Sequence, residues 1–174
     1  PKNGTLEYNE ESLNGLNSQR IMTRGITLVP EGRRVFPNLT VLENLQIGAY
    51  LRKDKEGIAA DIKRIYELFP RLEERNWQMA GTLSGGEQQR VAIARAISHS
   101  PKIIFADEPT AELDSPTAMA VMKLFRDLVR QNDLTIVMTT HDTTMMDLAD
   151  IVYTLEDGVI SDVKENQPEE GADA

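Results

Sequence analysis

The stretch 83–90, which reads LSGGEQQR, and the adjacent carboxylates Asp107 and Glu108 constrain this chain more than any other feature. Ser84 and Glu87 have the S-x-x-E spacing of a capping box, so a helix should begin at the two glycines between them. A short apolar run then leads directly into the two carboxylates. A Gly-rich helix start followed by a strand that ends in carboxylates is typical of an α/β domain, in which ligands bind beyond the carboxyl ends of parallel strands.

The remaining pattern alternates between short apolar runs and amphipathic stretches. It predicts a strand at 26–29, a buried strand at 102–106 and a strand at 134–139; helices at 40–50, 55–69, 84–98 and 143–149; a helix with Ser115 as N-cap and Pro116 in its first turn; and a hairpin of 151–155 and 159–161 around Asp157 and Gly158. Strands that alternate with helices predict an α/β fold with a largely parallel sheet. The segment 40–80 should contain helices only and form a satellite subdomain.

Composition narrows the classes of partner. A length of 174 residues suits one domain, and the net charge of −9 argues against a nucleic-acid groove or an anionic membrane surface as the main partner. No apolar run approaches the roughly 18 residues that a membrane span needs, and the absence of cysteine excludes disulfides and thiolate zinc sites. The acidic segment 163–174 lacks apolar anchors and is expected to be a disordered tail.

Two groups of residues offer chemistry that suits a phosphate. The backbone N–H groups of Ser84, Gly85 and Gly86 should lie at a helix N-terminus, where the partial positive charge favours an anion and glycine permits its close approach. Asp107 and Glu108 supply the oxygen ligands that Mg²⁺ prefers. Each pattern alone also fits a plain structural role, as a capped helix or a solvent-exposed acidic turn. The combination and spacing of the two favour a site.

A phosphate-binding loop that normally accompanies such motifs is absent from the sequence. The pattern G-x-x-x-x-G-K-[ST] does not occur, and no lysine in the chain follows a glycine. The chain also begins with Pro1 and not with methionine. We therefore expect a truncated or engineered chain, although removal of an initiator methionine before proline gives the same first residue.

The LSGGEQQR string and the strand that ends in Asp107 and Glu108 resemble the signature loop and the Walker B strand of the ABC-type ATPases. The resemblance implies an incomplete P-loop NTPase fold: an ABC nucleotide-binding domain over 1–162 that lacks its N-terminal Walker A unit, with a helical subdomain at about 40–98. It implies that Asp107 holds Mg²⁺ and that Glu108 is the general base toward the attacking water. The residues that it implies contact ATP held by a partner subunit are Leu83, Ser84, Gly85, Gly86 and Glu87.

Three further positions carry the resemblance. His141, in the string TTHD, resembles the switch histidine that contacts the γ-phosphate. Asp114 closes the string AELD, which resembles the D-loop that links two ATP sites, but Glu112 stands where a small residue is usual. Glu31 occupies the position of the Q-loop glutamine, which implies an approach to Mg²⁺ or to the attacking water. A surface acid beside two arginines is the alternative for Glu31.

The two halves of the chain resemble different branches of the family. Residues 1–89 resemble the ATPases of branched-chain amino-acid importers, in strings such as VPEGRRVFPNLTVLENLQIGAY. Residues 90–162 resemble the lipoprotein-releasing and macrolide-exporting type, in strings such as RVAIARAISHSPKIIFADEPTAELDS. A natural relative with mixed features and a chimera joined near Gln89 both fit this pattern.

The function that the resemblance implies is hydrolysis of MgATP by a dimer of ATP-binding subunits, coupled to transport through transmembrane permease subunits. Such a subunit would be cytoplasmic and peripheral at the inner face of the membrane. Because no lysine follows a glycine, the chain alone is expected not to turn over ATP. The alternative is a binding or assembly module that only completes the ATP site of a partner in trans. Soluble ABC proteins of DNA repair or translation fit less well, because 45–83 is too short for a long coiled coil and the chain does not hold two domains.

Overall fold

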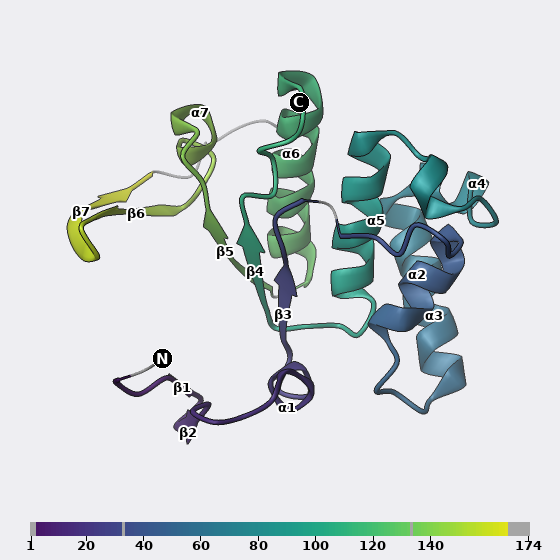
Figure 1. The fold of residues 1–174 in the computed structure, drawn as a ribbon, viewed down its shortest axis with the longest axis horizontal. Coiled ribbons are helices and arrows are strands. Elements are labelled where there is room, and N and C mark those ends of the chain that lie inside the picture. The colour runs from purple at the N-terminus through teal and green to yellow at the C-terminus, as the bar shows by residue number, and fades with distance from the viewer. Residues whose placement is uncertain (1–2, 33, 133, 167–174) are drawn as a thin grey trace.

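Three parallel strands form the central sheet of the computed structural model, which describes residues 3–32, 34–132 and 134–166 (Figure 1). They are β3 (Ile26–Val29), β4 (Ile103–Asp107) and β5 (Thr135–Thr139), in the spatial order β3-β4-β5. Val29 lies opposite Ala106, and Asp107 lies opposite Thr139, so the carboxyl ends of the strands meet at one edge. The predicted α/β fold with a parallel sheet is confirmed.

Only one face of this sheet is covered by the described helices. Val29, Ile104 and Ala106 are buried on that face, where α5 (Gly85–Ile97) packs against β3 and α6 (Ser115–Asn132) packs against β5. On the other face Leu28, Phe105 and Val137 lie side by side in register and are 59%, 43% and 46% exposed. The prediction of a fully buried β4 is therefore wrong: its side chains alternate between a covered and an uncovered face.

The segment between β3 and β4 forms the helical subdomain to the right of the sheet in Figure 1. It contains α2 (Val41–Gly48), α3 (Lys55–Leu68), α4 (Pro70–Glu74) and η1 (Ala80–Thr82) before α5 begins. Thr40 and Glu43 form the predicted capping box at the start of α2. Pro70 ends the predicted helix, and it also occupies the first turn of α4, where its missing N–H costs no hydrogen bond.

Close approach of α2 to α5 depends on Gly48. A Cβ atom built at Gly48 would lie 2.0 Å from Ser98 Oγ and 2.2 Å from the carbonyl oxygen of Arg95. No side chain fits at those distances, so the two helices pack through backbone at this point. The apolar core that spans both halves of the domain includes Leu45 on α2, Ile65 on α3 and Ile93 on α5, each with 0% exposure.

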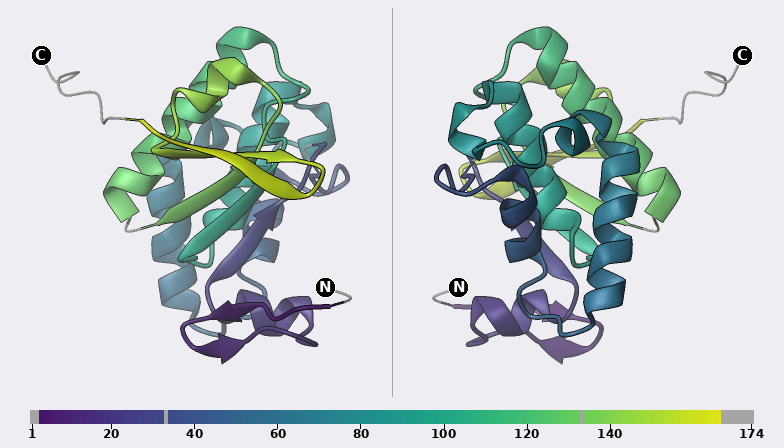
Figure 2. Two further views of the ribbon diagram at one scale, coloured as in Figure 1. Left: turned by 90° about the vertical axis from the view of Figure 1, so that its left-hand side faces the viewer. Right: turned by 90° about the vertical axis from the view of Figure 1, so that its right-hand side faces the viewer.

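The two ends of the described chain carry small antiparallel ribbons (Figure 2). At the N-terminal end these are β1 (Glu7–Tyr8) and β2 (Glu11–Ser12), followed by α1 (Ser18–Met22); at the C-terminal end, α7 (Thr143–Met146) precedes the hairpin of β6 (Ile151–Glu156) and β7 (Val159–Glu165). Asp157 and Gly158 both have positive φ, as a two-residue hairpin turn of type I′ requires.

Several sequence-based boundaries differ from the structure. Helix α7 ends at Met146, shorter than the predicted 143–149. Asp114, and not Ser115, lies at the N-cap position of α6, because its carbonyl accepts a hydrogen bond from Ala118 N and its carboxylate accepts from Thr117. Strand β7 extends to Glu165, three residues into the predicted tail, while 167–174 lie outside the described residues. No helix within the described ranges is long and apolar enough to cross a membrane.

Candidate functional site

The carboxyl ends of β4 and β5 are held together at Asp107, Glu108 and Thr139. The Thr139 hydroxyl donates to Asp107 Oδ1 at 2.7 Å, and the backbone N–H of Glu108 lies 3.2 Å from both the carbonyl and the hydroxyl oxygen of Thr139. These bonds fix the backbone on which both carboxylates stand. They also orient the Asp107 carboxylate, the candidate Mg²⁺ ligand, at the edge where ligands of parallel sheets bind.

Glu108 leaves the strand through a strained backbone conformation. Its φ is +44°, in the left-handed region that residues other than glycine rarely adopt and that costs of order 1–3 kcal/mol. Strain of this kind persists where the surrounding structure fixes the residue, as the two bonds to Thr139 do here. The turn separates the directions of the Asp107 and Glu108 side chains, because Glu108 no longer follows the alternation of the strand.

Glu108 Oε1 lies 2.8 Å from His141 Nδ1, and the two form an ion pair when His141 is protonated. The hydrogen bond and the negative charge of Glu108 raise the pKa of His141 above its usual 6.5, and Asp142 acts in the same direction. The His141 side chain is 80% exposed and that of Glu108 only 24%. The His141 ring is therefore open to a ligand, whereas the Glu108 side chain is partly buried.

The signature loop has the capping-box geometry that its sequence predicts. Ser84 N and Oγ both donate to Glu87 Oε2, at 3.0 and 2.8 Å, and Glu87 N donates back to Ser84 Oγ at 3.4 Å. Glu87 Oε1 also pairs with Arg75 Nη1 at 2.9 Å. Burial alone raises the pKa of Glu87, but the hydrogen bonds from Ser84 and the charges of Arg75 and Arg71 outweigh it, so the pKa is lowered overall.

Neutralisation by Arg75 matters because Glu87 places a negative charge at a helix N-terminus where a phosphate would have to approach. The first-turn N–H groups of Gly85 and Gly86 have no acceptor within α5, as at any helix start. A Cβ atom at Gly86 would lie 2.6 Å from Thr117 Cγ2. The signature loop thus packs directly on the first turn of α6, next to Asp114.

The segment from Glu108 to Asp114 is a series of tight turns. Ala111 N donates to the Glu108 carbonyl, and Leu113 N donates to the Thr110 carbonyl. Hydrogen bonds from Thr117 lower the pKa of Asp114, so the candidate D-loop aspartate is an ionised helix cap. The buried side chain of Gln89 donates to the Pro109 carbonyl at 2.8 Å and fastens these turns to α5.

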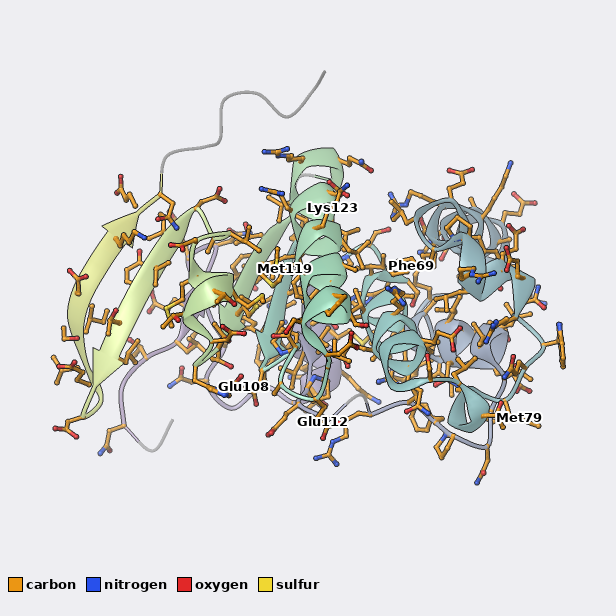
Figure 3. The ribbon with its side chains drawn as sticks, turned by 90° about the horizontal axis from the view of Figure 1, so that it is seen from above. Phe69, Met79, Glu108, Glu112, Met119 and Lys123 are labelled. Carbon is orange, nitrogen blue, oxygen red and sulfur yellow. The ribbon has the colours of Figure 1, made fainter. Side chains whose placement is uncertain are left out.

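Glu31 stands in an exposed turn that follows β3. Arg34 Nε donates to the Glu31 carbonyl at 3.1 Å, and a Cβ atom at Gly32 would lie 3.9 Å from Glu112 Oε1. The candidate Q-loop and D-loop therefore approach each other at the same edge of the sheet. Figure 3 looks onto this edge and shows Glu108 and Glu112 there, whereas Met79 lies far out on the helical subdomain.

The structure brings the predicted residues into two groups. One contains Asp107, Glu108 and His141; the other contains the signature loop and Asp114, joined through Gly86 and Thr117. Within the described ranges no cluster of three or more histidine, aspartate or glutamate side chains is arranged to hold a metal ion. A Mg²⁺ ion at Asp107 would take most of its ligands from phosphate oxygens and water, as is common for this ion.

Sequence reasoning missed several residues that position these groups: Arg75, Gln89, Arg95 and Thr139. The sequence could have indicated Thr139, because it ends the strand beside the one that carries Asp107. It indicated Gln89 weakly, because the helical pattern of α5 turns this polar residue towards the core. It gave no indication of Arg75 or Arg95, since their partners lie in distant segments of the chain.

A parallel sheet with paired carboxylates at its carboxyl edge, and a Gly-rich loop at the start of the adjacent helix, define a domain of the P-loop NTPase class. The family model described as "ABC transporter" matches residues 1–111. The chain is 41% identical over 157 residues to the high-affinity branched-chain amino acid transport ATP-binding protein BraG of Pseudomonas aeruginosa, with 90% of this chain and 67% of that protein covered. It is 34% identical to the lipoprotein-releasing system ATP-binding protein LolD of Shewanella denitrificans, with 92% of this chain and 70% of that protein covered.

Solved structures agree with these relatives. A dimeric structure of the ATP-binding cassette MJ0796, in a post-hydrolysis state bound to ADP and Pi, is 28% identical and superposes with a TM-score of 0.81 over 97% of this chain and 75% of that one. The chain spans between 54% and 72% of the length of the curated relatives BraG and LolD that it matches. The chain belongs to the family of ABC transporter ATP-binding subunits. The resemblance to ABC-type ATPases that the sequence shows in both of its halves is therefore confirmed.

Proposed function

We propose that this chain is an ATP-binding subunit of an ABC transporter that contributes its signature loop to an ATP site completed by a second subunit. The observation that carries the proposal is the set of hydrogen bonds and the ion pair at the signature loop. The Glu87 carboxylate folds back over the helix start and accepts from Ser84 N and Oγ, and Arg75 neutralises its charge. The first-turn N–H groups of Gly85 and Gly86 therefore stay open to an anion. The surface presented by Ser84, Gly85 and Gly86 suits the γ-phosphate of a nucleotide bound elsewhere.

The second group of residues suits the hydrolytic half of a site. Asp107 fits a Mg²⁺ ligand because Thr139 orients its carboxylate, and Glu31 lies in the turn that follows the neighbouring strand β3. When bound, Mg²⁺ would neutralise charge on the phosphate oxygens. In this proposal Glu108 accepts the proton of an attacking water, and His141, whose pKa Glu108 raises, faces a phosphate oxygen. The ion pair between them must open for both roles to be filled.

The sequence lacks the phosphate-binding loop G-x-x-x-x-G-K-[ST] and its lysine, which such a site requires. Catalysis of phosphoryl transfer rests almost entirely on positioning and electrostatic stabilisation of the phosphates. We therefore infer that this chain alone hydrolyses ATP negligibly, and that its contribution is to a mixed dimer. A role in transport is suggested by the names of BraG and LolD. Coupling to permease subunits at the inner face of a membrane is what the family resemblance implies, and it belongs to the same proposal.

The test uses a complete ABC ATPase subunit whose own signature serine is replaced by arginine, so that its homodimers do not turn over. Addition of this chain should restore MgATP hydrolysis through one composite site. Ser84→Arg in this chain should lower the restored rate by about 100-fold, because it puts bulk and charge where the γ-phosphate must lie. Ser161→Arg, an exposed serine on β7, is the matched control and should leave the rate unchanged.

Two outcomes would contradict the proposal. Failure of the unaltered chain to restore turnover would show that the signature loop is not used in trans. Clear turnover by the chain without any partner, abolished by Glu108→Gln, would show that another segment replaces the phosphate-binding loop. In that case the chain is a self-sufficient enzyme and not one half of a composite site.

A further inference from the structure

Arg95 is a half-buried cation whose guanidinium binds backbone. It lies on α5, 11 positions after Ser84, and its Nη2 donates to the backbone carbonyl of Arg34 at 2.8 Å. Its guanidinium carbon lies 5.2 Å from the centre of the Phe36 ring. Within the described residues no carboxylate pairs with it, and its Nη1 is buried with no acceptor. Burial lowers the pKa of Arg95, although a guanidinium stays charged.

The backbone that Arg95 holds is bent tightly. Arg34 has a φ of +44° and its N–H donates to the Gly32 carbonyl at 2.5 Å, so the chain turns sharply between Glu31 and Phe36. A non-glycine residue in this region needs support from its surroundings. The hydrogen bond from Arg95 to the carbonyl of the strained residue itself provides that support.

A second side chain holds the same segment from the opposite helix. Asn44, fully buried on α2, accepts from Phe36 N at 2.9 Å and donates to the Phe36 carbonyl at 3.1 Å. Phe36 is therefore fixed by Asn44 on α2 and by Arg95 on α5. A displacement of Arg34 or Phe36 therefore either moves one of these two helices or breaks one of these hydrogen bonds.

We propose that Arg95 is a positioning residue: it couples the segment 31–36, which carries Glu31, to the helix whose first turn is the signature loop. The proposal rests on the proposed function, since the signature loop must face a partner's nucleotide for the coupling to matter. A leucine or methionine would fill the same space at lower cost, because burial of a cation without a counter-ion is unfavourable. The guanidinium supplies a directed bond to a strained carbonyl and a cation–π contact, which an apolar side chain does not.

The experiment compares Arg95→Met, Arg95→Lys and the control Arg52→Met in the full chain. Arg52 is also half-buried in the helical subdomain, and it pairs with Asp54 and Asp61 and not with the segment 31–36. Arg52→Met therefore shows the effect of losing a half-buried arginine elsewhere in the domain. Amide hydrogen exchange is measured at 34–36 and at 87–88, where Glu87 N and Gln88 N donate to Ser84 at the start of α5. Arg95→Met should speed exchange in both segments about tenfold or more, whereas Arg52→Met should leave both near the level of the unaltered chain.

Kinetics of the composite site provide the second readout. In the mixed dimer, Arg95→Met should lower kcat by about 10- to 100-fold, as small displacements of positioning groups do, and should leave the KM for MgATP within about twofold. Arg95→Lys retains a donor for the Arg34 carbonyl and should recover most of kcat. Arg52→Met should change neither constant at a temperature where it is folded.

The outcomes separate this inference from the proposed function. If the unaltered chain supports no composite turnover, the proposed function fails and exchange at 34–36 and 87–88 alone decides the role of Arg95. Unchanged exchange in Arg95→Met overturns the inference in either case. A fall in kcat that Arg52→Met reproduces, or one that Arg95→Lys does not relieve, would show that Arg95 only stabilises the fold.

Discussion

Gln89 offers the sharpest test of how α5 is joined to the candidate active site. Its side chain is 3% exposed, and Nε2 donates at 2.8 Å to the carbonyl of Pro109, the buried residue that follows Glu108. Gln89→Met keeps the length of the side chain and removes the donor. The Pro109 carbonyl then loses its partner inside the protein, which costs about 1–3 kcal/mol. For a domain of this size each kcal/mol lowers Tm by about 2–4 °C, so a fall of roughly 2–12 °C is expected.

Gln88→Met is the matched control for this change. Gln88 is only half-buried, and its Nε2 bonds to the Leu83 carbonyl at 3.1 Å, where water can replace it. Its substitution should change the free energy of unfolding by no more than about 0.5 kcal/mol. Thermal and urea unfolding followed by circular dichroism measure both variants. Equal losses for Gln88→Met and Gln89→Met would refute the reasoning, because burial of the unpaired carbonyl would then carry no cost.

Two further predictions concern charge and association. The two histidines should titrate on opposite sides of 6.5 by NMR, because Glu108 raises the pKa of His141, while burial and the Arg52 charge lower the pKa of His99. The contribution of His141 to stability is then present below pH 6.5 and is lost as the pH rises through its folded pKa. The contribution of His99 is present above pH 6.5 and is lost as the pH falls through its folded pKa. Titration of His141 at pH 6.5 or below would contradict the ion pair with Glu108. The isolated chain should self-associate at micromolar concentration in sedimentation, because among the described strands β5 pairs only with β4 and one sheet face is uncovered. Val137→Lys should shift the chain towards monomer more than Val159→Lys on the hairpin, and equal effects would argue against the sheet as the contact.

Local signals in the sequence predicted most of the elements. Both capping boxes, at Thr40 and Ser84, begin helices where the S/T-x-x-E spacing places them. The hairpin turn at Asp157 and Gly158 follows from residues that tolerate positive φ. These predictions hold because each depends on residues within four positions of one another, so tertiary contacts do not override them.

Features that depend on distant segments were not predictable in the same way. The exposure of Phe105 follows from the lack of a described helix on one sheet face, which the apolar run of β4 does not reveal. The bond from Arg95 to the Arg34 carbonyl spans 61 residues. Every residue carries a carbonyl, so a side chain that binds backbone leaves no pattern of paired residue types in the sequence. Positioning residues that bind backbone, such as Gln89 and Arg95, are therefore the class that sequence reasoning overlooks.

Helix α5 links the parts of the candidate site because its polar side chains leave it in different directions. Gln89 and Arg95 are six positions apart, which at 3.6 residues per turn sets them about 120° apart around the helix axis. Gln89 reaches the turns after Glu108, Arg95 reaches the segment that carries Glu31, and Ser84 stands at the free end. A helix of 13 residues is stiff on the scale of these contacts. If the proposed function holds, we expect a displacement of either loop to reach the signature loop as a rotation or tilt of α5, and a partner's nucleotide at Ser84 to act on both loops through the same contacts.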